Sequence, residues 1–378
     1  MIEIGTMGFP YRASAIATGA AMLAEAEGVD ALWYPDHLMA WHPRELWREA
    51  GGVLAEVVDD PHAYADPFVA ATVSLMATRR PRVGIAVTDT YRRHPATIAQ
   101  AAATLSELAP GRFVLGLGSG EGLNTAPLGI ARTRPVGRLG EALEIVTRLL
   151  GTDGPVSFRG EHFTIDRLPG MASSRAPSTP PLEIVLGGHS DGLLELVGRY
   201  GTGWLPVLPT TAEQYQARLA LAQRAAEAAG RDPGGIVPGL YLYAVIHEDH
   251  DVAEKALEGV LLRVQALAGN ADVFAQAGLE HPLGPGFAGL RDYIPEWVPT
   301  ATIRDAANDL PVEGAGHFVA HGTPAEIVAR LQPFVDVGVR RVVIDNLLPL
   351  GIPEELEGAN RATRAAIRAA RLTFRSVA

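Results

Sequence analysis

The chain has 378 residues, of which 47% are hydrophobic, so it can bury a large core. Its net charge is −11 and no basic run exceeds two residues, which argues against a nucleic-acid partner. Cysteine is absent, which excludes disulfides, thiolate nucleophiles and cysteine metal ligands. No apolar run is long enough to predict a membrane span, and the first residues resemble a strand and no signal peptide. We therefore expect a cytoplasmic protein.

The first half of the chain alternates between strand-like and helix-like segments. Apolar runs predict strands, and helical spacing of apolar residues predicts the helices between them. The expected strands are 2–7, 31–34, 82–87 and 112–117, and the expected helices are 14–28, 67–78, 95–108 and 134–150.

The same alternation continues in the second half, after a loop-rich stretch, 155–179, with a short hairpin near 158–165. Thr323 and Glu326 form the pattern of a capping box at a helix start. The segment 269–315 contains several prolines and glycines and is expected to be irregular. The expected strands are 182–186, 203–208, 239–246 and 341–345, and the other expected helices are 193–200, 212–229, 251–268 and 353–373.

Eight strands with helices between them predict the α/β class, as a (β/α)8 TIM barrel that forms a single domain over residues 1–378. Two long insertions, 43–66 and 269–315, would follow the second and seventh strands. A doubly wound open sheet is the alternative. That fold would favour a glycine-rich nucleotide loop after the first strand, and Gly5-Thr6-Met7-Gly8 matches that loop poorly.

The second expected strand ends in Asp36 and His37, and Trp41 follows four residues after the histidine. In an α/β barrel, residues just beyond the carboxyl end of a strand are placed to carry catalysis. A carboxylate, an imidazole and an indole could together orient and tune a proton-transfer group. The structural alternative is a polar turn in which His37 makes an ordinary hydrogen bond.

A glycine-rich loop with the sequence Gly118-Ser119-Gly120-Glu121-Gly122 follows the fourth expected strand. Such a loop lets the backbone approach a ligand closely, but it lacks the lysine of a phosphate-binding P-loop. Glu121 is the unusual residue, because a carboxylate suits proton transfer better than phosphate binding. A helix-capping acid is the structural alternative for Glu121.

Two further strand ends carry candidate binding residues. Thr88 to Pro95 contains hydroxyls and arginines before a helix, and Gly187-Gly188 lies at another strand–helix junction that could bind an anion. An exposed loop and a tight turn are the respective structural alternatives. The remaining histidines lack metal-ligand spacing, so no metal site is expected.

These motifs, in this order, resemble the bacterial luciferase-like flavin and deazaflavin oxidoreductases. The resemblance covers almost the whole chain and is stronger to the branch that uses coenzyme F420, which includes glucose-6-phosphate dehydrogenases and phthiodiolone ketoreductases. It implies that His37, Trp41 and Glu121 occupy catalytic positions. It also implies cofactor contacts at Asp36, Ile85, Ala86, Thr88, Gly120, Asn124, Gly187 and Gly188.

The resemblance further implies a TIM-like barrel that holds the deazaflavin across its carboxyl-terminal face, a non-prolyl cis peptide around Ile85-Ala86, and a homodimer. The chain departs from the family in two respects. Its single lysine, Lys255, lies far from the motifs, so glucose 6-phosphate is not expected as the substrate. Asp89 stands where the family has an apolar residue or proline, which puts the contacts of that loop in doubt.

The resulting hypothesis is hydride transfer between reduced F420 and a C=O, C=N or C=C bond of a largely uncharged organic substrate. His37 or Glu121 would move the proton, Trp41 would shape the site, and Asp36 would hold His37 in place. One alternative is an FMN-dependent monooxygenase on the same fold. A second is a deazaflavin-binding protein without catalytic activity.

Overall fold

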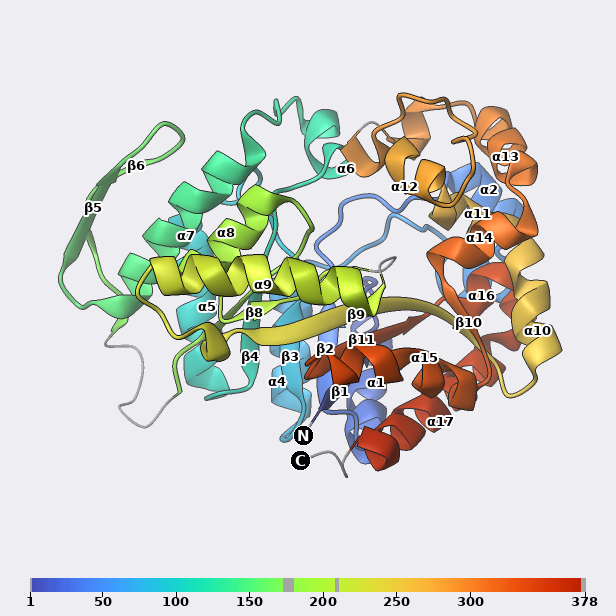
Figure 1. Ribbon diagram of the computed structural model, residues 1–378, viewed down its shortest axis with the longest axis horizontal. Coiled ribbons are helices and arrows are strands. Elements are labelled where there is room, and N and C mark those ends of the chain that lie inside the picture. The colour runs from blue at the N-terminus through green and yellow to red at the C-terminus, as the bar shows by residue number, and fades with distance from the viewer. Residues whose placement is uncertain (1, 173–179, 208–210, 292, 375–378) are drawn as a thin grey trace.

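Eight parallel strands close into a barrel, as the sequence predicted (Figure 1). The computed structural model describes residues 2–172, 180–207, 211–291 and 293–374. Pairing of β8 with β9 completes a ring in the order β9-β11-β1-β2-β3-β4-β7-β8. The barrel strands are β1 (Glu3–Met7), β2 (Ala31–Tyr34), β3 (Arg82–Ile85), β4 (Phe113–Leu117), β7 (Glu183–Leu186), β8 (Gly203–Trp204), β9 (Val237–Ile246) and β11 (Arg341–Asn346).

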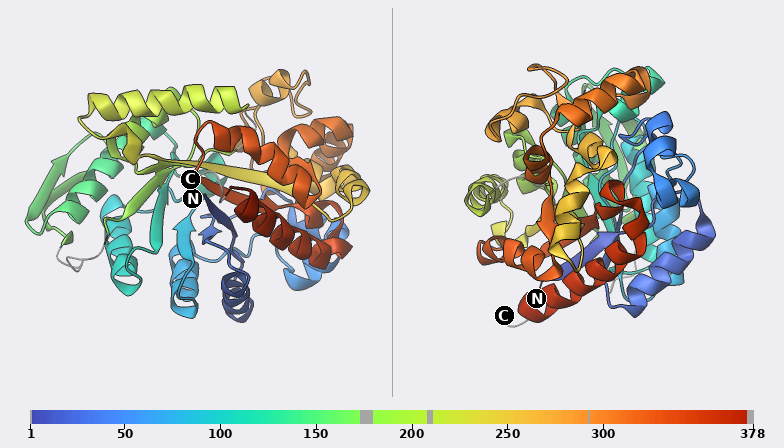
Figure 2. Two further views of the ribbon diagram at one scale, coloured as in Figure 1. Left: turned by 60° about the horizontal axis from the view of Figure 1, so that its bottom comes forward. Right: turned by 90° about the vertical axis from the view of Figure 1, so that its right-hand side faces the viewer.

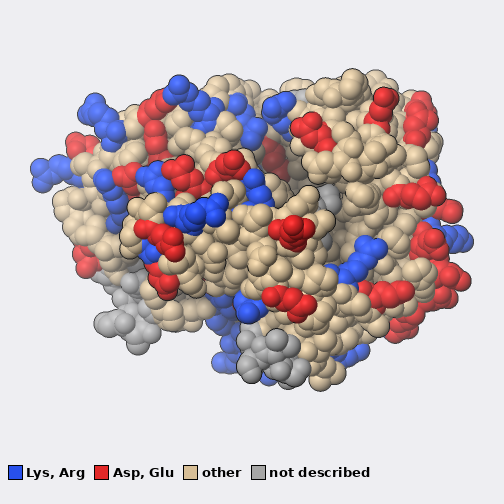
Figure 3. Space-filling view, viewed as in Figure 1, with Lys and Arg blue, Asp and Glu red and all other residues tan. Residues whose placement is uncertain are grey.

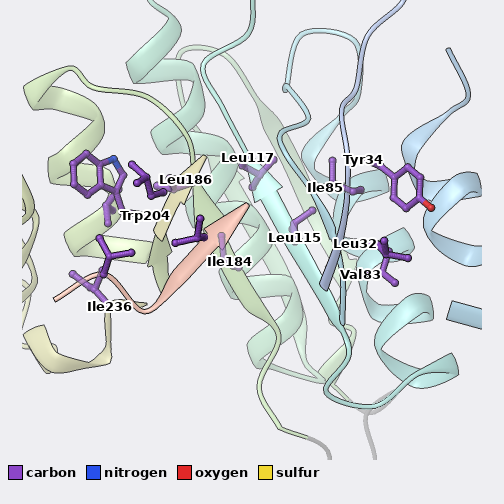
Figure 4. Close-up of a cluster of buried hydrophobic side chains, with 14 of the residues drawn as sticks. Leu32, Tyr34, Val83, Ile85, Leu115, Leu117, Ile184, Leu186, Trp204 and Ile236 are labelled. Carbon is purple, nitrogen blue, oxygen red and sulfur yellow. The ribbon is translucent and has the colours of Figure 1, made fainter. Parts of the chain in front are cut away.

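The side chains of each strand alternate between the barrel interior and the surrounding layer of helices. On β2, Leu32 and Tyr34 belong to the large outer core (Figure 4), whereas Trp33 belongs to the interior cluster. The indole of Trp33 needs room inside the barrel, and glycines provide it. A Cβ atom on Gly84 would lie 2.3 Å from the Trp33 ring, and one on Gly5 would lie 2.9 Å from it.

One long helix follows each barrel strand and covers its outer face, and α1, α4 and α5 lie along one flank in Figure 2. The capping box of Thr323 and Glu326 is present at the start of α15, as predicted. Of the helices in the described ranges, none has the length and apolarity to cross a bilayer. The outer helices are α1 (Ser14–Ala26), α4 (Pro67–Ala77), α5 (Pro95–Leu108), α7 (Pro135–Gly151), α8 (Asp191–Tyr200), α9 (Ala212–Ala228), α15 (Pro324–Asp336) and α17 (Leu356–Phe374).

Insertions follow β2 and β9, the second and seventh barrel strands, and pack against each other around their own apolar cluster. Leu46 and Trp47 of the first insertion join Leu261, Phe274 and Tyr293 of the second. The first contains α2 (Arg44–Ala50) and α3 (Gly52–Val57). The second contains α10 (His250–Lys255), η4 (Ala256–Glu258), α11 (Val260–Ala266), α12 (Ala271–Gln276), η5 (Gly289–Arg291), η6 (Pro295–Trp297), α13 (Thr300–Asp309) and α14 (Val312–Phe318).

The prediction of an irregular 269–315 segment was therefore wrong in part, because two of its prolines directly precede helices. Pro299 and Pro311 occupy the N-cap positions of α13 and α14. The single helix expected over 251–268 is also interrupted, at Gly259. A Cβ atom there would lie 2.4 Å from the Cα atom of Gly351, so the close approach of another segment requires glycine.

Several short elements complete the fold. The hairpin of β5 (Pro155–Arg159) and β6 (Thr164–Pro169) is longer than predicted, and β10 (Ala320–Gly322) pairs with β9 outside the ring. The strand expected over 203–208 is only Gly203–Trp204, and Leu208 and residues 173–179 of the expected loop lie outside the described residues. The others are α6 (Gly122–Thr125), η1 (Ala126–Leu128), η3 (Pro233–Gly235), α16 (Leu348–Gly351) and η7 (Pro353–Glu355).

A cluster of four charged side chains ties together strands at the amino-terminal end of the barrel. Arg341 on β11 is only 2% exposed and contacts Glu3, at 2.5 Å, and Glu183. Arg82 on β3 contacts the same two carboxylates. Burial by itself would raise the pKa of Glu183, but its bonds to Arg341 and Arg82 lower that pKa below the ordinary value.

We predict that Glu183→Ala lowers the free energy of unfolding by about 3–5 kcal/mol, because it leaves the buried Arg341 charge poorly compensated. Urea unfolding followed by circular dichroism measures this change. The control is Glu195→Ala on α8, which removes an exposed ion pair with Arg199 and should cost less than about 1 kcal/mol. Equal losses in the two variants would contradict a structural role for the cluster.

Candidate active site

The carboxyl ends of the barrel strands surround a cavity of about 430 Å³. It is lined by ten of the eleven residues that the sequence singled out: Asp36, His37, Trp41, Ala86, Thr88, Gly120, Glu121, Asn124, Gly187 and Gly188. Ile85 is the exception, since its side chain is fully buried in the outer core. The face drawn in Figure 3 is hollowed near its top centre, between the region of α8 and α9 and that of α12 in Figure 1.

His37 lies at the centre of the candidate site and contacts side chains from two other segments. Its Nδ1 atom is 3.7 Å from Oε2 of Glu121, and its ring centroid is 5.0 Å from that of Trp41 and 5.6 Å from that of Tyr64. The His37 side chain is mostly buried, whereas that of Glu121 is 34% exposed. The structure thus brings the three expected catalytic residues together.

Asn124 determines how the His37 ring is oriented. Its Oδ1 atom accepts a hydrogen bond from the Leu38 backbone N–H at 2.9 Å, so its Nδ2 atom faces His37 and donates to Nδ1 at 3.2 Å. Because Nδ1 accepts this bond, the proton of the neutral ring resides on Nε2. His37 is therefore a hydrogen-bond donor toward a ligand through Nε2.

Among the described residues, Asp36 makes no direct hydrogen bond to the His37 ring, so it does not hold the ring as expected. The buried carboxylate of Asp36 accepts hydrogen bonds from Thr88 Oγ1 at 2.6 Å and Arg92 Nη1 at 3.1 Å. Arg93 Nε lies 3.4 Å from it, and Arg92 also donates to the Asp36 carbonyl. These bonds fasten the end of β2 to the segment after β3, so Asp36 positions the backbone from which His37 projects.

Asp89, which raised doubt in the sequence, has a clear partner. It is buried, and its carboxylate accepts a hydrogen bond from Arg92 Nε at 2.6 Å and from the backbone N–H of Tyr91 and of Arg92. Arg92 is thus bonded to both Asp36 and Asp89. Its positive charge is offset by two carboxylates and leaves little attraction for an anionic ligand.

Glu121 occupies the N-cap position of α6, yet its side chain makes no capping hydrogen bond. Its carboxylate instead lies near Asn124 Nδ2, at 3.5 Å, and near His37. Gly120 precedes it with φ of +75°, a conformation that favours glycine. The turn at Gly120 therefore directs Glu121 toward the histidine, and the helix-capping alternative does not hold.

Part of the cavity wall is glycine backbone. Gly187 and Gly188 follow β7, and Gly188 has φ of +129°, which a side chain would disfavour. The carbonyl of Gly188 accepts a hydrogen bond from Trp204 Nε1 at 2.9 Å. A non-prolyl cis peptide joins Ala86 to Val87, one residue later than expected.

Comparisons with known proteins agree with this arrangement. Residues 10–341 match the family of luciferase-like monooxygenases. The chain belongs to this family. A phthiodiolone/phenolphthiodiolone dimycocerosates ketoreductase of Mycobacterium kansasii is 32% identical over 344 residues, which are 89% of this chain and 92% of that protein. An F420-dependent glucose-6-phosphate dehydrogenase of Nakamurella multipartita is 30% identical over 348 residues, 89% of each chain.

A solved structure shares the fold of this luciferase-like protein. That structure, an F420-dependent secondary alcohol dehydrogenase in complex with an F420-acetone adduct, aligns with a TM-score of 0.74 and 21% identity, and the alignment covers 98% of this chain and 99% of that chain. Because these relatives are a ketoreductase and F420-dependent dehydrogenases, the luciferase-like chain is an oxidoreductase. Within the described ranges, no group of side chains is arranged to hold a metal ion.

Sequence reasoning missed several residues of the cavity, notably Asp345, Tyr241 and Tyr64. Asp345 is buried at the end of β11, and Tyr241 donates a hydrogen bond to its Oδ2 atom at 3.0 Å. Burial raises the pKa of Asp345 to about 7, although the bond from Tyr241 opposes this shift. A carboxylate directly after an apolar strand was the signal that identified Asp36, and it could have identified Asp345 as well.

We predict that Asp345 makes the protein less stable as the pH rises. Its folded pKa of about 7 exceeds the ordinary 3.8, so the native state keeps a proton that the unfolded chain has lost between these values. The free energy of unfolding should fall across this interval by up to about 4 kcal/mol and change little above it. Urea unfolding from pH 4 to pH 8 measures the effect.

Asp345→Asn should remove this fall, because the amide does not titrate and still accepts the bond from Tyr241. Asp309→Asn, at an exposed position, is the control and should keep the wild-type dependence. If the Asp345→Asn and wild-type curves are parallel, Asp345 does not titrate in this interval.

Proposed function

We propose that this protein is an F420-dependent reductase that acts on a C=O, C=N or C=C bond of a largely uncharged organic substrate. The convergence of His37, Trp41 and Glu121 on one cavity carries the proposal, because it combines a hydrogen-bond donor, an apolar wall and a partly exposed carboxyl group. The names of the curated relatives, a ketoreductase and an F420-dependent dehydrogenase, support it.

The cavity residues fit a deazaflavin ring. Gly118, Gly120, Gly187 and Gly188 line the cavity without side chains, which allows a flat ligand to approach the backbone. The buried Trp41 Nε1 atom has no hydrogen-bond partner among the described residues and is available to a ligand. Thr88 and Asn124 would contact the coenzyme, and the Asp36 network would hold Thr88 in position.

The coenzyme, when bound in its reduced form, supplies a hydride to the substrate. His37 donates a hydrogen bond from Nε2 to the oxygen of a carbonyl substrate and so polarises it. Loss of the Nε2 proton would leave an imidazolate, because Nδ1 carries no proton in this tautomer. Glu121 is therefore the better proton donor, and proton transfer from its carboxyl group completes reduction of the carbonyl to an alcohol.

The charges of the cavity support an uncharged substrate. Among the described lining residues, Arg92 is the one arginine or lysine, and it is bonded to Asp36 and Asp89. A substrate phosphate would find no free cation here. The single lysine of the chain already argued against glucose 6-phosphate as the substrate. The pairing of Arg92 with two carboxylates adds to that argument.

We predict that Glu121→Gln lowers kcat by about 100-fold or more, since the amide has no proton to give, while F420 binding is retained. Quenching of coenzyme fluorescence measures binding, and loss of reduced F420 with a ketone substrate measures turnover. The control is Glu107→Gln, at an exposed position on α5, which should leave both unchanged. Full activity in Glu121→Gln would assign the proton to another group.

The FMN-dependent alternative is tested with the same preparations. Structural neighbours include the long-chain alkane monooxygenase LadA, which aligns with a TM-score of 0.66 and 14% identity. An F420-dependent reductase should turn over without consuming oxygen. Tight FMN binding, with oxygen uptake and no affinity for F420, would overturn the proposed function.

We further propose a cytoplasmic homodimer that uses the outer faces of α1 and α4. Met22 on α1 and Val69 and Met76 on α4 are exposed apolar side chains on neighbouring helices. Light scattering after size-exclusion chromatography should give twice the chain mass for the wild type and the chain mass for Val69→Glu. Leu128→Glu, which alters an exposed leucine on η1, should remain a dimer; a monomeric wild type would contradict the proposal.

A further inference from the structure

A second cavity, of about 520 Å³, adjoins the candidate active site. It lies on the outside of β1, where α1 and α17 form its two sides and the first insertion contributes Leu54, Val57 and Val58. Five residues line both cavities and form what we call the shared wall: Met7, Trp41, Tyr64, Gln265 and Asp345. The two cavities therefore lie against the same five side chains.

The lining of the second cavity is mainly aliphatic and aromatic. Ala20, Ala24 and Leu23 contribute from α1, and Leu356 and Ile367 contribute from α17. Other apolar lining residues come from β2 and the residues before it, and from the segments that follow β1 and β11: Val29, Leu32, Phe9, Pro10, Leu347, Pro349 and Leu350. The volume is that of a ligand-sized pocket, too large to result from loose packing.

Several polar groups of this lining are already bonded within the protein. Thr6 Oγ1 donates to the Ile344 carbonyl at 2.9 Å, and Trp47 Nε1 donates to the Val58 carbonyl at 2.7 Å. His42 Nε2 lies 2.9 Å from the Leu261 carbonyl, and burial lowers the pKa of this histidine to about 4, so the ring is neutral.

Polar lining residues from β11 and α17 are also bonded within the protein. Asn346 Nδ2 donates to the carbonyls of Ile246 and Ala359 and to Thr363 Oγ1, at 3.0–3.1 Å. Arg364 forms an ion pair with Glu27 at 3.0 Å, so neither end of this pair is free to hold an ionic ligand. A ligand in the second cavity would therefore interact through apolar contact and gain little from polar groups.

The shared wall, by contrast, presents polar groups to the cavities. Trp41 Nε1 lacks a partner among the described residues, and the Asp345 carboxyl group, hydrogen-bonded by Tyr241, faces both cavities. At the outer side of the second cavity, Ile16 and Leu23 on α1 and Val57 on α3 are 45–52% exposed. Polarity thus falls from the reaction centre to an apolar opening at the surface.

We propose that the second cavity is the binding site for a long aliphatic chain of the substrate. The reactive carbonyl lies beside His37, the chain passes the shared wall, and its methylene groups fill the space between α1 and α17. The mainly apolar lining, in which Arg364 and Glu27 are paired with each other, favours an unbranched hydrocarbon chain without a terminal charge. This inference rests on the proposed reductase function for the position of the carbonyl, but not for the binding of the chain.

The test uses 2-alkanones of increasing length, from 2-butanone to 2-tridecanone. Their affinity for the full chain is measured by calorimetry without coenzyme, and KM is measured with reduced F420. Each methylene buried in the second cavity should lower Kd roughly fourfold. A Kd that does not depend on length beyond the first few carbons would overturn the inference.

Matched variants on α1 locate the chain. Ala20→Phe and Ala24→Leu fill the second cavity and should weaken binding of 2-tridecanone at least tenfold, while 2-butanone binding is unchanged. Ala26→Phe, at an exposed position of the same helix outside the cavity lining, should behave as the wild type. Two cavity variants are used so that misfolding of one, detected by circular dichroism, does not decide the result.

The outcomes separate this inference from the proposed function. Chain-length dependence that Ala20→Phe abolishes, in a protein without affinity for F420, would support the chain site and refute the reductase. Turnover with F420 that is indifferent to chain length and to both cavity variants would support the reductase and refute the chain site.

Discussion

Closure of the parallel barrel is the constraint on which the other features of this protein depend. Pairing of β8 with β9 completes the ring, and because all eight strands run in one direction, their carboxyl ends meet at one rim. His37 and Glu121 follow β2 and β4, and Asp345 lies near the end of β11; they share no local sequence, yet they line one cavity. Any change that opened the ring would separate these groups before it disturbed their individual chemistry.

Buried ion pairs join chain segments at both ends of the barrel. At the amino-terminal end, Arg341 and its carboxylate partners join strands, and at the carboxyl-terminal end Arg92 joins the segments after β2 and β3. The amino-terminal cluster pairs two arginines with two carboxylates, whereas Arg92 is bonded to two carboxylates and leaves no free positive charge in the cavity lining. Glu121 is an exception, a half-buried carboxyl group beside a histidine, which is the situation expected of a group that moves protons.

Local sequence identified the candidate site residues whose role depends on their position relative to a single strand. Asp36 and His37 were found because they follow a short apolar run, and Glu121 because it lies in a glycine-rich loop after a strand. The alternation of strands and helices predicted the barrel. Local sequence failed where the partner is distant. Asn124, in place of Asp36, orients His37, and Ile85 faces the outer core. The helices of 269–315 form because α12 and α13 bury Phe274 and Ile303 in the same apolar cluster as Trp47 of the other insertion.

The sequence by itself thus determined the fold class, the strand ends that carry chemistry and the absence of cysteine chemistry. These follow from apolar periodicity and composition, which are properties of neighbouring residues. The tertiary structure alone decided which nitrogen of His37 carries the proton, how Asp36 is used, and that a second apolar cavity adjoins the first. Hydrogen-bond partners and cavities arise between segments far apart in the chain, so no local pattern specifies them.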